Sequence, residues 1–170
     1  MASYRIKQAI KESAIAAGIA AVPGSFVPGI DIVAVGGSWL YMMNQIADEY
    51  NITFEEDATR FIGTIAAAVG GYWTDSKIFT YTTGAILSIF TFGAGVLLIP
   101  ISNVILNMYF TWSVGKKMDL IFASESNTKA GDEVAKLIIK MVCNIPDRSE
   151  IKEFWNECGL SLDLIKSWFD

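Results

Sequence analysis

The stretch AVPGSFVPGID, residues 21–31, decides the fold because it interrupts an apolar run near its middle. From Ser13 to Ala47 the chain carries a single charged residue, Asp31. Proline and glycine within the stretch stop a helix from propagating, so the run reads as two short helices instead of one long one. We expect a helical hairpin with arms at residues 4–22 and 32–50. The turn residues that set it are Pro23, Pro28 and Gly29.

A second run, from Ile78 to Gly115, has no charged residue at all. Gly93-Ala94-Gly95 and Pro100 break it, and proline fits the first turn of a helix. We therefore expect a second hairpin with arms at residues 78–90 and 100–124. Between the hairpins, Thr53 and Glu56 have the spacing of a capping box and predict a helix at residues 54–73. No segment alternates apolar and polar residues, so the fold class is predicted to be an all-α helical bundle.

Charged residues return after residue 125, and the chain is predicted to divide there into a hairpin domain (1–125) and an amphipathic tail (126–170). Three short helices fit the tail, at residues 132–143, 147–158 and 161–169. Their apolar faces, which include Trp155 and Trp168, need a cover from the hairpins or from a partner.

Composition excludes several classes of function. Of 170 residues, 52% are apolar and 18% charged, which places the chain between a soluble helical protein and a compact membrane protein. The net charge of −5 and the lack of a Lys/Arg run argue against a nucleic-acid partner. The chain has no histidine, no nucleotide-binding loop and no nucleophile motif, so we expect no enzyme, cofactor or metal site. Its two cysteines, Cys143 and Cys158, are expected to be reduced thiols in helix-packing faces.

Asp31 has two interpretations. An ionisable group in apolar surroundings can bind a cation or relay a proton. Directly after a Pro-Gly turn, the same carboxylate can cap the helix that follows and oppose its dipole, which is the interpretation we favour.

A polar stripe is predicted on one face of the helix at residues 100–124. Asn103, Asn107 and Thr111 lie four residues apart and so share that face. The stripe can line a path for water or ions, or it can form hydrogen bonds between packed helices. We favour the packing interpretation, because buried amides are usually used in this way.

Three segments together resemble a known family: AVPGSFVPGIDIVAV, MMNQIADEYNITFEEDATRFIGTIAAAVGG and NVILNMYFTWSVGKKMDLIF. They are similar to the YcjF-like family of uncharacterised helical domains, often found C-terminal to Era-like GTPase domains. The resemblance covers about residues 10–125 and rests on the Pro28–Asp31 turn, residues 47–51 and the helix from Thr111 to Phe122. The EcsC-like family has a similar pattern. The resemblance implies membrane association and a GTPase acting in trans, and it supplies no catalytic residues.

Three hypotheses follow from the apolar hairpins. Most arms are shorter than the roughly 20 apolar residues of a spanning helix, so hairpins that insert without spanning suit them better. Basic residues beside the runs fit the cytoplasmic face of a membrane, and we expect a mature cytosolic N-terminus. We therefore expect a non-enzymatic, membrane-associated scaffold that binds lipid and a protein partner. The alternatives are a soluble cytoplasmic homo-oligomer that buries the hairpins in subunit contacts and a small pore lined by the polar stripe.

Overall fold

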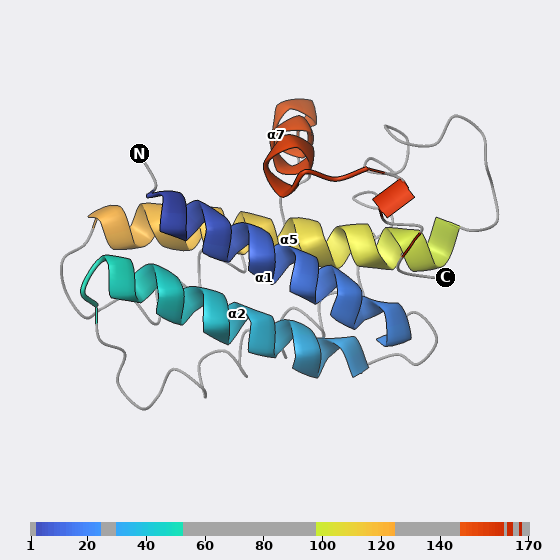
Figure 1. The fold of residues 1–170 in the computed structure, drawn as a ribbon, viewed down its shortest axis with the longest axis horizontal. Helices are drawn as coiled ribbons and strands as arrows, with labels where there is room; N and C mark the ends of the chain where they lie inside the picture. Colours follow the sequence, from blue (N-terminus) through green and yellow to red (C-terminus); the bar gives the residue numbers. More distant parts are fainter. Residues whose placement is uncertain are drawn as a thin grey trace.

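The computed structural model describes residues 3–24, 30–52, 98–124 and 147–161, together with residues 163, 164 and 167. Within these residues the protein is an all-α bundle, as predicted (Figure 1). Its helices are α1 (Tyr4–Gly24), α2 (Ile30–Glu49), α5 (Leu98–Ser124) and α7 (Arg148–Cys158).

Helices α1 and α2 form an antiparallel hairpin, as the broken apolar run predicted. Glu49 at the end of α2 accepts hydrogen bonds from Ser3 Oγ at 2.9 Å and from Arg5 at 3.3 Å, so the start of α1 lies beside the end of α2. One boundary prediction was wrong: α1 continues through Pro23 to Gly24. Proline in a last turn removes only one backbone hydrogen bond, which leaves the helix intact to its end.

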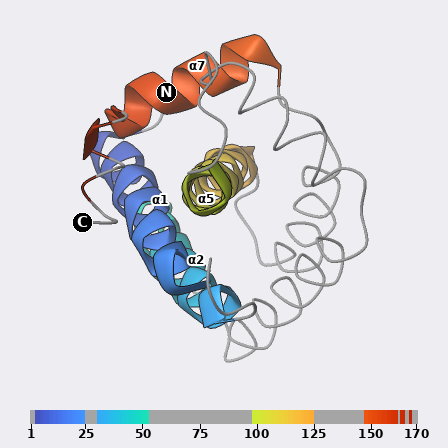
Figure 2. The ribbon, with the colours of Figure 1, turned by 90° about the vertical axis from the view of Figure 1, so that its right-hand side faces the viewer.

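Helix α5 is the central element of the described structure. Figure 2 looks along its axis, with α1 and α2 on one side and α7 lying across another. Every side chain from Val104 to Trp112 is buried. A helix segment that is buried on all sides needs neighbours on all sides, and its few polar groups need partners inside the core. Pro100 lies in its first turn, as predicted.

Glycines allow α5 to approach the hairpin closely. A Cβ atom on Gly115 would lie 2.6 Å from Met42 Sδ and 2.7 Å from Ile10 Cγ1. At the other end of the contact, a Cβ atom on Gly18 of α1 would lie 2.8 Å from Met108 Sδ. All three distances are shorter than real Cβ contacts, so a side chain at either position would force a neighbouring side chain to shift.

Helix α7 has well-defined caps at both ends. Asp147 Oδ1 accepts from the backbone N–H of Ser149 at 2.7 Å and of Glu150 at 2.9 Å, and Glu150 reaches back to the Asp147 N–H at 3.3 Å. Sequence analysis missed this capping box, although the Asp-x-x-Glu spacing predicts it. The helix stops at Gly159, whose φ of 63° is left-handed. Lys11 Nζ of α1 lies near Gly159. Its positive charge is favourable there, at the negative C-terminal end of the α7 dipole.

Several predictions fall outside the described residues. They are the helices at residues 54–73, 78–90 and 132–143, most of that at 161–169, and the domain boundary after residue 125. In the part of the chain that the structure does describe, no helix combines the length and apolar character required to cross a bilayer.

Candidate functional site

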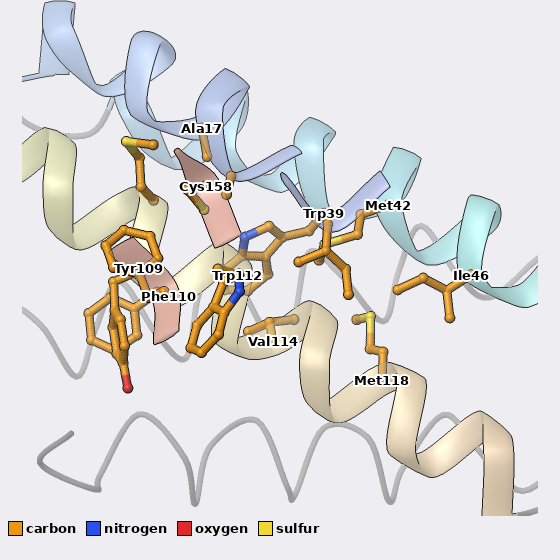
Figure 3. Close-up of a cluster of buried hydrophobic side chains, with 14 of the residues drawn as sticks. Ala17, Trp39, Met42, Ile46, Tyr109, Phe110, Trp112, Val114, Met118 and Cys158 are labelled. Carbon is orange, nitrogen blue, oxygen red and sulfur yellow. The ribbon is translucent and has the colours of Figure 1, made fainter. Parts of the chain in front are cut away.

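Thr111, from the predicted polar stripe of α5, faces α2 inside the core. Trp39 Nε1 of α2 donates a hydrogen bond of 2.7 Å to Thr111 Oγ1, and both side chains are buried. Figure 3 shows Trp39 among the apolar side chains of α2 and α5. An indole N–H buried with an acceptor has its hydrogen-bonding need met. The geometry at Thr111 is therefore that of helix packing, the interpretation favoured from sequence.

The rest of the predicted stripe is only partly visible. Asn107, one turn before Thr111, is 6% exposed and also has an interaction partner. Asn103 lies on α5, but its side chain is outside the described set. Two of the three predicted polar positions are thus buried and engaged.

The stripe extends two turns further than sequence analysis took it. Continuing from Thr111 in steps of four leads to Gly115 and then to Asp119, which is 9% exposed. The Tyr50 hydroxyl, just after α2, donates to Asp119 Oδ1 at 2.7 Å. Burial and the adjacent carboxylate raise the pKa of Tyr50 to about 12. The four-residue spacing of Asn103, Asn107 and Thr111, continued along the helix, predicts that Asp119 shares their face.

Helix α7 lies across α5 next to α1, and it contacts α5 through charged and indole groups (Figure 2). Trp112 Nε1 donates to Glu157 at 2.8 Å. Lys116 Nζ contacts Glu153 at 2.8 Å and Glu157 at 3.3 Å, and it lies 5.5 Å from the centre of the Trp112 ring. Burial acts to lower the pKa of Lys116, but the two glutamates outweigh it and the pKa is raised. These residues form a closed set of contacts that fixes α7 on α5.

Aromatic rings fill the space beneath those charges. The Phe154 ring centre lies 5.5 Å from that of Tyr109 and 5.7 Å from that of Trp112. Burial, reinforced by the nearby charge of Glu150, raises the pKa of the Tyr109 hydroxyl. Trp155, a predicted interaction residue, is half-buried with its ring 6.4 Å from that of Phe154. Trp155 therefore lies at the edge of this aromatic cluster.

A groove opens at the surface between α1 and α2. Its volume is about 430 Å³. Ser13 is buried in its wall, and within the described residues Ser13 Oγ has no hydrogen-bond partner. Tyr41 is 52% exposed. The groove is lined by Glu12, Ser13, Ala16, Gly37, Ser38 and Tyr41.

The remaining predicted residues are placed only in part. Asp31 is the second residue of α2, so it lies inside the first turn and not at the capping position before it. The side chains of Asp31 and Pro23 are not among those described, and Pro28, Gly29 and Trp168 lie outside the described residues. Asp31 is not the capping residue because α2 begins one residue before it, at Ile30.

Cys158 is a free, buried thiol whose pKa is raised to about 12 by burial, with Glu157 adding to the effect. Cys143 lies outside the described residues. Among the residues that the structure covers, no three His, Cys, Asp or Glu side chains gather into a set suited to a metal ion.

Comparison with known proteins found no matching family, no matching curated protein and no matching solved structure.

Proposed function

We propose that the protein is a non-enzymatic helical scaffold that acts through the outer surfaces of its helices at a membrane. The observation that carries the proposal is the Trp39–Thr111 hydrogen bond in the buried α2–α5 contact. This bond gives Thr111 a packing role, although its polar stripe was the candidate path for water or ions. Among the described residues, the groups that remain for a partner are those on the outside of the bundle.

Lipid is the partner class that the start of α1 favours. Tyr4 is 79% exposed, and Lys7, one turn further along the helix, is exposed beside it. Tyrosine is suited to the interface between a bilayer and water, and lysine is attracted to anionic headgroups. The two residues share a helix face because they are three positions apart. We expect this end of α1 to meet the membrane surface.

Vesicle co-sedimentation tests the proposal. The full chain is mixed with vesicles of phosphatidylcholine, with and without phosphatidylserine, and centrifuged. We expect it to sediment with the anionic vesicles, and the double variant Tyr4→Ala/Lys7→Glu to sediment several-fold less. Lys152→Glu, an equal charge change on the exposed face of α7, is the matched control and should behave as the wild type. Wild-type protein that stays in the supernatant with both vesicle types would overturn the proposal.

The YcjF-like resemblance adds a GTPase acting in trans as a further expected partner. This expectation rests on the resemblance alone and stays a prediction.

A further inference from the structure

We draw no further inference here: the strongest candidate, the shallow and mostly apolar groove between α1 and α2 beside Gly37 and Tyr41, carries nothing because nothing in the described part of the chain shows what covers it.

Discussion

Helix α5 is held differently on its two sides. The α1–α2 hairpin lies against it through glycines, methionines and hydrogen bonds to Thr111 and Asp119. Helix α7 lies against it through large aromatic rings and the Lys116 contacts. The first contact has little spare volume and is vulnerable to added atoms. The second gains its stability from large side chains and is vulnerable to their removal.

Truncating the aromatic contact should have the largest effect. Phe154 is 1% exposed and contacts Tyr109 and Trp112, so Phe154→Ala removes a ring from the centre of the α5–α7 contact. We expect a loss of about 3–5 kcal/mol in the free energy of unfolding, measured by urea denaturation. Trp155→Ala, at the half-buried edge of the same cluster, is the control and should cost clearly less. Equal losses in the two variants would contradict this account of the contact.

Adding one methyl group should distinguish the hairpin contact from the surface. Gly115→Ala places a Cβ atom against Met42 and Ile10, and we expect it to destabilise the protein by about 1–3 kcal/mol. Gly37→Ala makes the same change where the described residues leave space, and it should stabilise by up to about 1 kcal/mol through better helix propensity. Thermal unfolding of both variants checks the opposite signs. A stabilising Gly115→Ala would show that α5 does not need the close approach.

Sequence anticipated the elements better than the contacts between them. The break near Pro23 and the position of Pro100 identified α1, α2 and α5 to within two residues, because backbone preferences are local. Which glycine faces a neighbour is not local: nothing near Gly115 or Gly37 in the sequence distinguishes them, and only packing shows that one is required.

The candidate site shows the same limit. Four-residue spacing identified Asn107 and Thr111 as sharing a face, but the Trp39 partner of Thr111 lies on another helix 72 positions away. The groove was also missed, since it exists only where α1 and α2 meet. A pattern along one helix predicts a face, and the neighbouring helix decides what that face binds.

Breaking the buried hydrogen bond of the hairpin contact should have an intermediate effect. Thr111→Val keeps the shape of the side chain but leaves the Trp39 N–H without its acceptor. We expect a loss of about 1–3 kcal/mol, the cost of an unpaired buried donor. In the double variant Trp39→Phe/Thr111→Val both polar groups are gone, so the combined loss should be smaller than the sum of the two single losses. Additive losses in urea denaturation would argue against a coupled pair.

Alkaline pH should weaken the hairpin contact through Tyr50. Its pKa is about 12 in the folded protein against a usual value of 10. The folded state therefore holds the proton more tightly, so the stabilisation is complete below pH 10 and is lost as the pH rises toward 12. Urea denaturation of the wild type between these values should show a steeper decline than that of Tyr50→Phe, which cannot ionise. Parallel pH profiles for the two proteins would show that the Tyr50–Asp119 bond is not linked to folding.

Removing the charge from the α7 contact should have the smallest effect. Lys116 and its glutamate partners are each at least 30% exposed, and exposed ion pairs typically contribute about 0.2–1 kcal/mol. Lys116→Met keeps most of the aliphatic packing on Trp112 and removes the charge, so we expect a loss within that range. Salt should reduce the wild-type stability toward that of the variant, because ions screen exposed pairs. Thr111→Val provides the comparison: its loss should not change with salt, since the bond that it removes is neutral and buried. A loss at Lys116 that is also independent of salt would mean that its charge does not hold α7, which is then held by the rings and by the Trp112–Glu157 hydrogen bond.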